Sequence, residues 1–275
     1  MHRHPTPRHE QRPDGTQPSV TVTLLGSFRV TVDGTTTAAR GWSRKTAATL
    51  VKVLALAPGH RLHREQVLDI LWPDEPTERS APRLHKAAHF ARRAAGRDDA
   101  IVLRDDVVWL FPGVDITVDA VRFEQLARAA VAEGDEDAAR EALSWYRGEL
   151  LPSDRYEEWA LDRRELLHLR RLDVLRVAGE WRELAELDPT NEEAHTELMR
   201  RHLEAGATSA ALRQYEHLER VLDRELGVEP EKAAASLKVD ALLAELAELV
   251  HREAAVLAEL AAAGAEPPAL HSMEP

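Results

Sequence analysis

The polar and apolar positions near the start of the chain alternate with a period of two. In residues 19–25 (SVTVTLL), valines and a leucine alternate with threonines, and residues 28–32 (FRVTV) repeat the alternation. This period is typical of strands with one buried face. Gly26–Ser27 predicts a turn between the two strands, and Asp33–Gly34 predicts a second turn toward a short threonine-rich strand.

The apolar spacing then changes to that of helices. Residues 43–59 and 62–73 carry apolar residues three or four positions apart, and prolines end both segments. Residues 79–97 (RSAPRLHKAAHFARRAAGR) predict a third helix with Ser80 as its candidate N-cap, and Pro82 in its first turn argues against a much earlier start. The pairs AIVLR and VVWLF, joined by Asp105–Asp106, predict a hairpin.

Charge separates this N-terminal region from the rest of the chain. The whole sequence is acidic, with 36 Lys and Arg against 48 Asp and Glu. Residues 40–113 hold 13 basic and 9 acidic side chains, whereas residues 114–275 hold 19 and 36. The third helical segment alone contains six basic residues, two histidines and no carboxylate. A polyanion responds to charge within about 8–10 Å, so this local excess matters more than the net charge.

The third helix separates small residues from basic ones. One face carries Leu84 and four alanines, at positions 87, 88, 91 and 94. The basic stripe and the residues beside it are Arg83, Lys86, Arg93, Arg97, His85, His89 and Arg92. An alanine face lets the helix pack closely, and a thin cationic helix fits the major groove, which is about 12 Å wide. The hairpin is then the wing, and the two histidines, which have no third ligand nearby, predict no metal site.

Helical spacing continues from Val118 onward and includes an internal repeat. Residues 121–148 and 192–218 each predict a helix, a glycine turn and a second helix, offset by 72 residues with Gly134 matching Gly206. Such units predict tetratricopeptide-like stacking. Thr190 and Glu193 are a candidate capping box. The aromatic residues Trp145, Tyr146, Trp159 and Trp181 are expected in the core between helices, with a ligand groove as the alternative.

A last helix, running to about Ala262, carries an apolar stripe. Its members are Val239, Leu242, Leu246, Leu249 and Leu257, widened by Leu243, Val250 and Leu260. Two interpretations stay open: the stripe packs on the last repeat, or it joins two copies as a homodimer. Residues 1–19 and the segment GAEPPALHSMEP are expected to be disordered because they are polar and proline-rich.

Several segments resemble a known family. LLGSFRVTVDG, RLHKAAHFARRAAG and VVWLFPGVDITVDAVRFEQLA look like the OmpR-like winged-helix domain of bacterial regulators of antibiotic synthesis. YRGELLPSDRYEEWALDRRELLHLRRLDVLR and AALRQYEHLERVLDRELGVEP resemble the bacterial transcriptional activator domain that follows it in those proteins. The resemblance implies an α+β winged helix-turn-helix domain over residues 20–113 and an all-α tetratricopeptide-like domain over residues 117–231, with a C-terminal helix and end over residues 232–275.

The resemblance also implies a function and a set of site residues. The third helix would read double-stranded promoter DNA, commonly at direct repeats, and the domain would help recruit RNA polymerase. The expected DNA-contacting residues are Arg44, Lys45, Arg64, Arg79, Arg83, Lys86, His89, Arg92, Arg93, Arg97 and Arg104. The chain is then a transcriptional regulator, expected in the cytoplasm and on the nucleoid.

Other classes of protein are disfavoured by what the sequence lacks. It has no cysteine, no G-x-x-x-x-G-K-[ST] loop, no H-E-x-x-H and no G-x-S-x-G, so we expect no enzyme, no cofactor and no metal. No apolar run is long enough to span a membrane. Two alternatives stay open: an adaptor whose winged helix docks protein, favoured by Pro82 and the acidic wing tip, and a sensor whose helical domain binds a metabolite.

Overall fold

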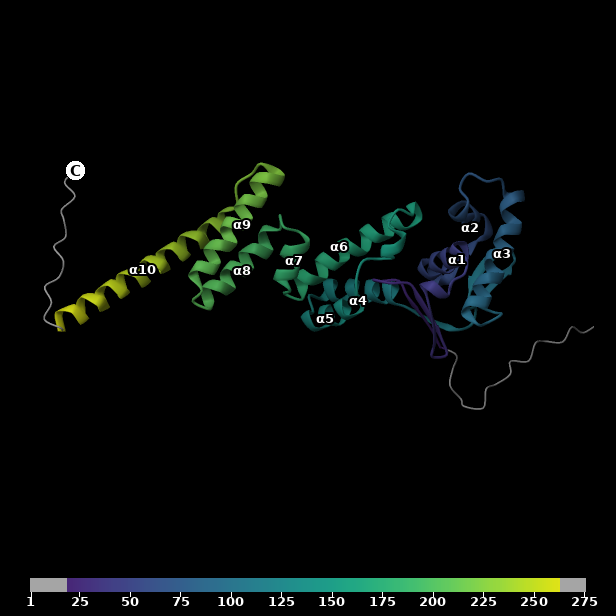
Figure 1. Ribbon diagram of the computed structural model, residues 1–275, viewed down its shortest axis with the longest axis horizontal. Coiled ribbons are helices and arrows are strands. Elements are labelled where there is room, and N and C mark those ends of the chain that lie inside the picture. The colour runs from purple at the N-terminus through teal and green to yellow at the C-terminus, as the bar shows by residue number, and fades with distance from the viewer. Residues whose placement is uncertain (1–18, 263–275) are drawn as a thin grey trace, which may run out of the picture. The chain divides into compact units, whose positions relative to one another are not determined.

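The computed structural model describes residues 19–262, which form two compact units (Figure 1). The first unit extends to Val174 and the second begins at Leu175. The boundary falls inside helix α6, Leu161–Val177. The domain limits expected from the sequence therefore stay a prediction, and each unit is described by itself.

The first unit opens with a four-stranded sheet. Its strands are β1 (Ser19–Thr23), β2 (Arg29–Val32), β3 (Thr35–Ala38) and β7 (Asp115–Val118), in the order β3-β2-β1-β7. Strands β1, β2 and β3 are antiparallel, as the short turns between them require. Val20 and Val22 lie on the buried face of β1. The predicted strands are confirmed. Strand β7 was not predicted; it pairs in parallel with β1, a contact between segments far apart in the sequence.

Three helices follow the sheet, as predicted. They are α1 (Lys45–Leu56), α2 (Arg64–Leu71) and α3 (Thr77–Ala95). The predicted start of the third helix is wrong, because α3 begins at Thr77 with Pro76 at its N-cap. Ser80 lies inside the first turn, where its hydroxyl donates to the backbone oxygens of Pro76 and Thr77. Pro82 removes one helical hydrogen bond in the second turn and leaves the helix intact.

The predicted wing is also present. Strands β4 (Arg61–His63), β5 (Ile101–Arg104) and β6 (Val107–Leu110) form a sheet in the order β4-β6-β5. Asp105 and Asp106, with φ of 53° and 57°, make the two-residue turn between β5 and β6. Two successive positive φ angles match the twist of a hairpin, and aspartate tolerates them better than most residues.

The first unit continues with a helical hairpin, α4 (Asp119–Glu133) and α5 (Glu136–Trp145). Gly134 ends α4 with φ of 65°, and the Asp135 carboxylate caps α5 by accepting from two backbone N–H groups. Two short 3₁₀ turns, Pro152–Asp154 and Glu158–Ala160, then lead into α6. These turns matter because they contact the winged helix, as described below.

The described part of the second unit, up to residue 262, consists of helices. They are α7 (Trp181–Leu187), α8 (Glu192–Glu204), α9 (Thr208–Leu226) and α10 (Lys232–Ala262). Its core includes Met199, Tyr215 and Leu218. The repeat predicted from the sequence is confirmed, because Gly206 joins α8 to α9 with positive φ as Gly134 joins α4 to α5.

The capping box expected before α8 is wrong. Asn191 is the N-cap, and its side-chain oxygen accepts from the Ala194 N–H at 3.1 Å. Thr190 instead donates to Asp188 at 2.9 Å. The sequence DPTNEEAH offers Thr and Asn side by side, and the helix starts one residue later than the pattern suggested.

Helix α10 meets the rest of the second unit only with its first turns. Ala234 and Ala241 are fully buried against α8 and α9. The predicted apolar stripe faces the other way and is exposed; Leu243, for example, is 60% exposed. The first of the two interpretations, packing on the last repeat, is therefore wrong for the stripe itself. The expected disorder at both ends concerns residues that, apart from Ser19 in β1, lie outside those described.

Candidate nucleic-acid interface

Helix α3 is held by its alanine face. Leu84, Ala88 and Ala91 are fully buried, and the helix packs against α1, α2 and β5. Small side chains let the α3 backbone approach its neighbours closely, and they leave the opposite side of the helix clear. The separation of small and basic residues predicted from the sequence is therefore present in the structure.

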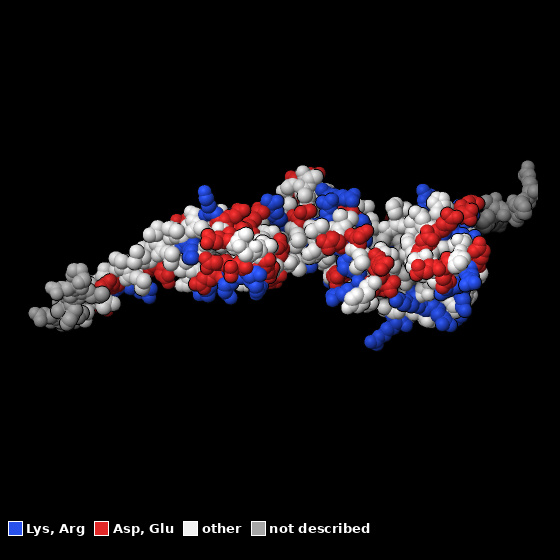
Figure 2. Space-filling model, turned by 90° about the horizontal axis from the view of Figure 1, so that it is seen from above, with Lys and Arg blue, Asp and Glu red and all other residues white. Residues whose placement is uncertain are grey.

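The outward side of α3 carries the basic residues. Five of them are exposed and are here called the α3 basic face: Arg79, Arg83, Lys86, His89 and Arg93. Arg79, Lys86 and Arg93 form no ion pair with any residue between 19 and 262. Figure 2 shows Lys and Arg gathered along one edge of the N-terminal part of the chain. Exposed cationic side chains without a carboxylate partner can bind the phosphates of a polyanion.

Arg83 is the exception on this face because it has a partner. Its guanidinium pairs with Glu75, in the loop before α3, and lies 4.8 Å from the centre of the Trp72 ring. Both charged side chains are well exposed. An exposed pair of this kind is worth only about 0–1 kcal/mol, so a phosphate can compete for the arginine.

Arg44 lies beside α3 although it belongs to the start of α1. It is the N-cap residue of α1, is exposed, and places its guanidinium carbon 5.3 Å from the Phe90 ring centre. The His89 ring meets the same phenylalanine edge-on, with 5.6 Å between ring centres. Arg44 and His89 are therefore brought together around one aromatic side chain.

Two arginines of the expected site are engaged inside the winged helix. Arg92 is partly buried and donates from Nε to the Ile101 carbonyl at 2.8 Å, which fastens α3 to β5. Arg97 donates two hydrogen bonds to the Asp99 carboxylate, from Nε at 2.8 Å and from Nη2 at 2.5 Å. The hydrogen bond to Asp99 raises the pKa of Arg97. Both side chains are thus engaged within the winged helix, and their expected contact with DNA stays a prediction.

Lys45 is also engaged. Its ammonium lies 2.6 Å from Glu157, which raises the pKa of Lys45 and lowers the pKa of Glu157. Glu157 comes from the segment before α6, so the sequence could not show that it lies beside α1. The Lys45 side chain is 74% exposed, so a phosphate can compete for it and its expected DNA contact stays a prediction.

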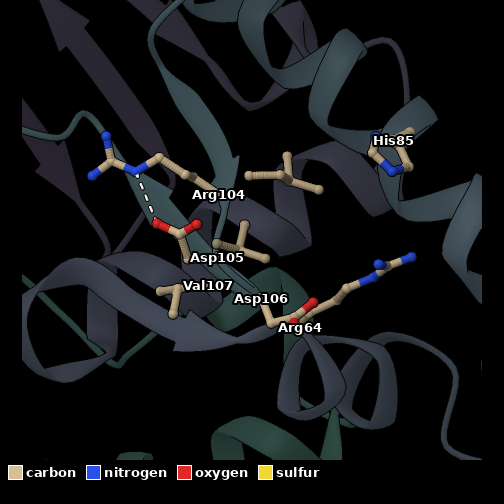
Figure 3. A pocket seen from close by; sticks show the side chains of 8 residues that line it. Arg64, His85, Arg104, Asp105, Asp106 and Val107 are labelled. Atoms are coloured by element: carbon tan, nitrogen blue, oxygen red, sulfur yellow. Dashed lines mark ion pairs between the residues drawn. The ribbon is translucent and has the colours of Figure 1, made fainter.

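The wing and the start of α2 enclose a pocket of about 200 Å³ (Figure 3). His85 of α3 lines one side, and hairpin residues that include Asp105 and Asp106 line the other. The Arg64 backbone N–H donates to the Asp106 carbonyl at 2.7 Å, and the Arg64 Nε is buried with no hydrogen-bond partner. Arg104 is exposed, and its guanidinium lies 3.5 Å from the carboxylate of the neighbouring Asp105. The wing tip therefore offers mixed charge.

The structure adds a basic residue that the sequence did not indicate. Arg61 lies on β4, is exposed, and places its guanidinium carbon 4.7 Å from the Trp109 ring centre on β6. Strand β4 has three residues and pairs only with β6, which lies far along the chain. No local alternation could therefore reveal it.

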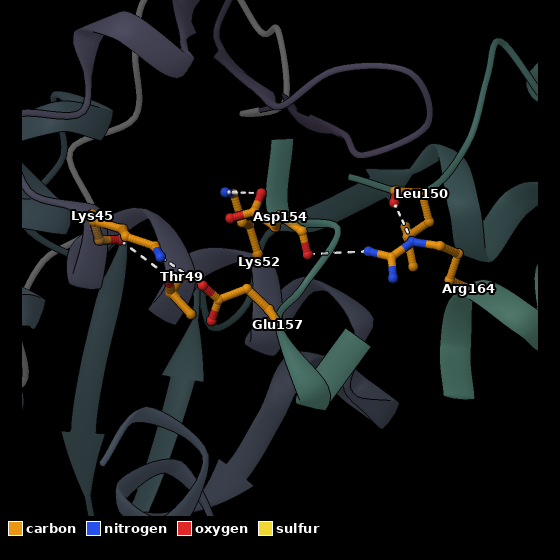
Figure 4. A network of polar contacts seen from close by, with 7 residues as sticks. All are labelled: Lys45, Thr49, Lys52, Leu150, Asp154, Glu157 and Arg164. Atoms are coloured by element: carbon orange, nitrogen blue, oxygen red, sulfur yellow. Dashed lines mark hydrogen bonds and ion pairs between the residues drawn. The ribbon is translucent and has the colours of Figure 1, made fainter. Parts of the chain in front are cut away.

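The basic residues of α1 face a different surface, here called the α1 seam: Lys45 and Lys52 against Asp154 and Glu157 (Figure 4). The Lys52 ammonium lies 2.6 Å from Asp154, and the two side chains are only 8% and 6% exposed. Arg164 of α6 donates to the backbone oxygens of Leu150 and Asp154. The winged helix and the first helical hairpin are thus joined through buried charge.

Backbone contacts strengthen the same junction. Leu151 N–H donates to the Leu24 carbonyl at 2.9 Å, and Gly26 N–H to the Glu149 carbonyl at 2.8 Å. The Asp119 carboxylate accepts from the N–H groups of Leu24 and Leu25. Burial raises the pKa of Asp119, and these hydrogen bonds oppose the rise. The β1–β2 connection is therefore fixed to the helices that follow β7.

Other kinds of site receive little support. Among residues 19–262, no three His, Asp or Glu side chains gather as a metal site would need. No helix in that range is long and apolar enough to cross a membrane. Tyr146 packs edge-on against Phe123 at 4.9 Å and beneath Arg171 at 4.8 Å, which favours a packing role for this aromatic residue over a ligand groove.

Comparisons with known proteins agree with the resemblance. Residues 174–243 match the family model described as the bacterial transcriptional activator domain. A solved structure of Mycobacterium tuberculosis EmbR, in complex with a low-affinity phosphopeptide, superposes with a TM-score of 0.60. It is 19% identical, and the match covers 88% of this chain and 72% of that chain. No curated protein matches.

These findings confirm two expectations. The fold is a winged helix followed by a tetratricopeptide-like helical domain, as in the EmbR structure. The match of residues 174–243 to the bacterial transcriptional activator domain agrees with the family that the sequence resembles.

Proposed function

We propose that this protein binds double-stranded promoter DNA through the α3 basic face and regulates transcription there, without catalytic activity. One observation carries the proposal: Arg79, Lys86 and Arg93 point outward from a helix that is fixed by its alanine face, and no described carboxylate neutralises them. Such a helix can enter the major groove, where phosphate contacts supply affinity and arginine contacts to guanine supply discrimination.

The revised set of contacts is smaller than the sequence suggested. Arg79, Arg83, Lys86, His89 and Arg93 contact DNA from α3, and Arg44 and Arg64 contact phosphates beside it. Arg104 and Arg61 add wing contacts that the acidic turn weakens. Lys45 is kept as a phosphate contact, because its exposed pair with Glu157 is of the same kind as the Arg83–Glu75 pair. Arg92 and Arg97 are left out because they are partly buried on partners within the protein.

The activator domain supplies the rest of the function. Its family match supports a role in contacting RNA polymerase, and the resemblance supports binding at direct repeats, with the chain acting in the cytoplasm on the nucleoid. EmbR was solved with a phosphopeptide, but the α3 basic face is the feature of this chain that points to a ligand class, and that class is DNA.

The test is a gel-shift titration with genomic and random duplex DNA at about 50 mM salt, where phosphate contacts are strongest. The native chain should bind both, and genomic fragments should reveal tighter sites. Lys86→Ala combined with Arg93→Ala should abolish the shift. Arg213→Ala, on an exposed arginine of α9 with no ion pair to a described residue, is the matched control and should bind normally. No binding by the native chain would favour the adaptor.

A further inference from the structure

The strongest unassigned surface of the described chain is the exposed side of α10. Eight large apolar side chains there are between 42% and 60% exposed: Val239, Leu242, Leu243, Leu246, Leu249, Val250, Val256 and Leu257. Figure 2 shows this part of the molecule as mostly uncharged. A contiguous apolar stripe on a soluble helix marks an interaction site.

The spacing of the stripe is that of a coiled coil. Val239, Leu246, Glu253 and Leu260 are seven residues apart and occupy one seam position, a. Leu242, Leu249 and Val256 occupy the other seam position, d, and Leu243, Val250 and Leu257 follow them at e. Ala234 and Ala241, which pack on α8 and α9, lie on a different face. Helix α10 can therefore hold a partner helix without leaving its own unit.

The charged residues that flank the seam identify that partner. Position g carries Lys238, Glu245, Arg252 and Glu259, in that order. When two copies run antiparallel with Leu246 opposite Leu249 of the second copy, each g residue faces a g residue of the other copy. Glu245 then faces Arg252, and Lys238 faces Glu259, so all four pairs are of opposite sign. To reach Glu259, the Lys238 ammonium leaves Glu219 of its own copy, 3.9 Å away, and the Tyr215 ring, whose centre is 4.3 Å away. The e residues face one another on the other flank, and they are all apolar.

A parallel pair has none of this complementarity. Its g residues would face e residues, which are Leu or Val, and the two Glu253 carboxylates would meet in one core layer. In the antiparallel pair each Glu253 lies opposite Leu242 of the second copy. The sequence of α10 is thus self-complementary in one orientation only, and a two-fold symmetric pair is the commonest assembly of identical chains.

We propose that α10 joins two copies of this chain as an antiparallel two-stranded coiled coil over residues 238–260. The proposal is independent of DNA binding, because α10 carries no residue of the proposed interface. It assigns the exposed stripe to a second copy of the chain rather than to a different protein or to the terminal segments.

Sedimentation equilibrium of the full chain without DNA tests the proposal. The native protein should be a dimer, and Leu249→Asp should raise its dissociation constant by at least about a hundredfold, because a charge enters the seam. Ala247→Asp, at a nearby exposed position outside the seam, is the matched control and should leave the dimer intact. A monomeric native chain, or a dimer that Leu249→Asp does not weaken, would overturn the proposal.

A charge exchange tests the orientation. Glu245→Arg and Arg252→Glu should each weaken the dimer about tenfold, since like charges then meet, and the double variant should restore it. In a parallel pair these residues face apolar side chains, so neither single change would have this effect. Circular dichroism of each variant checks that its helix content is unchanged, and failure of the double variant to recover would reject the antiparallel arrangement.

Discussion

The α3 basic face and the α1 seam use the same kinds of side chain in opposite ways. On α3, Lys86 and Arg93 project into solvent and have no described carboxylate partner. On α1, Lys52 is 8% exposed and lies 2.6 Å from Asp154. Both helices lie within residues 40–113, where basic side chains outnumber acidic ones although the whole chain is acidic.

The difference lies in where the acidic residues are. The segment that follows α5 brings Asp154 and Glu157 against α1. Acidic residues near the outward side of α3 include Glu75, which pairs with Arg83, and Glu78, which lies exposed in the first turn of α3 and forms no ion pair with a described residue. A buried lysine without its carboxylate would be costly, whereas a solvated lysine needs no partner. The proposed DNA contacts are therefore basic side chains that are exposed and have no partner, or only a weak exposed one, among the described residues.

Breaking the buried pair should have the largest effect. Asp154→Ala leaves the Lys52 ammonium buried and uncompensated, so the free energy of unfolding should fall by about 3–5 kcal/mol. Denaturant titration followed by circular dichroism measures the change. Replacing both partners, with Lys52→Met and Asp154→Leu, should recover most of the loss, because neither charge is then buried.

The matched control for that prediction is Asp137→Ala. Asp137 is also paired with an arginine, Arg140, but its side chain is 95% exposed. Its loss should change stability by no more than about 0.5 kcal/mol. If Asp154→Ala and Asp137→Ala lower the free energy of unfolding by the same amount, the buried Lys52–Asp154 pair does not stabilise the α1 seam.

Arg93→Ala tests the role of the α3 basic face in DNA binding. If its guanidinium reads a base, Arg93→Ala should cost about 1–3 kcal/mol of binding and relax specificity at one position. If it meets a phosphate, affinity should fall on all sequences, and the slope of log K against log salt should shrink by about one. Fluorescence anisotropy across a salt series separates these outcomes. In both cases stability should not change, unlike that of Asp154→Ala.

Glu75 offers a change in the opposite direction. Glu75→Gln releases Arg83 and removes a negative charge next to the α3 basic face, so DNA affinity should rise about threefold at low salt. The gain should shrink as salt increases. Glu133→Gln, an exposed change at the end of α4, is the control. A loss of affinity in Glu75→Gln would mean that the ion pair positions Arg83 for DNA.

The Lys45–Glu157 pair should give the smallest effect and a defined pH dependence. Its carboxylate has a lowered pKa, so the pair stabilises the fold above the ordinary carboxyl range and loses this contribution as pH falls through the lowered value. The raised pKa of Lys45 keeps the contribution up to alkaline pH. Glu157→Gln should therefore cost about 0.5 kcal/mol at pH 7 and nothing near pH 2. Thermal unfolding across pH measures the difference, which should not grow on acidification.

The elements that could be predicted from the sequence are those with a local pattern of apolar residues. The strands, the three helices, the wing and the 72-residue repeat follow from spacing and turn residues such as Asp105–Asp106 and Gly134. Strand β7 could not be predicted, because its four residues are recognised only by pairing with β1. Helix starts at Thr77 and Glu192 differ from expectation because neighbouring Ser, Thr and Asn residues compete as caps.

The candidate site was predictable as a helix but not residue by residue. The absence of carboxylates between Arg79 and Arg97 indicated α3 as the candidate helix, and the burial of its alanines sets its orientation in the fold. The partners of Arg92 and Lys45, which are Ile101 and Glu157, could not be recognised in advance, because tertiary packing brings them together. The net charge of a sequence segment can therefore indicate a basic surface. Which basic side chains on that surface have no partner within the protein is determined by tertiary packing.

A crosslink from position 89 tests the central claim most directly. The chain has no cysteine, so His89→Cys creates a unique thiol on the α3 basic face, which can carry a short photoreactive group. With bound duplex DNA, we expect irradiation to yield a protein–DNA adduct from position 89 and none from the same group on Arg213→Cys. Adducts of equal yield from both positions, or none from position 89 while DNA is bound, would contradict the assignment of α3 to the interface.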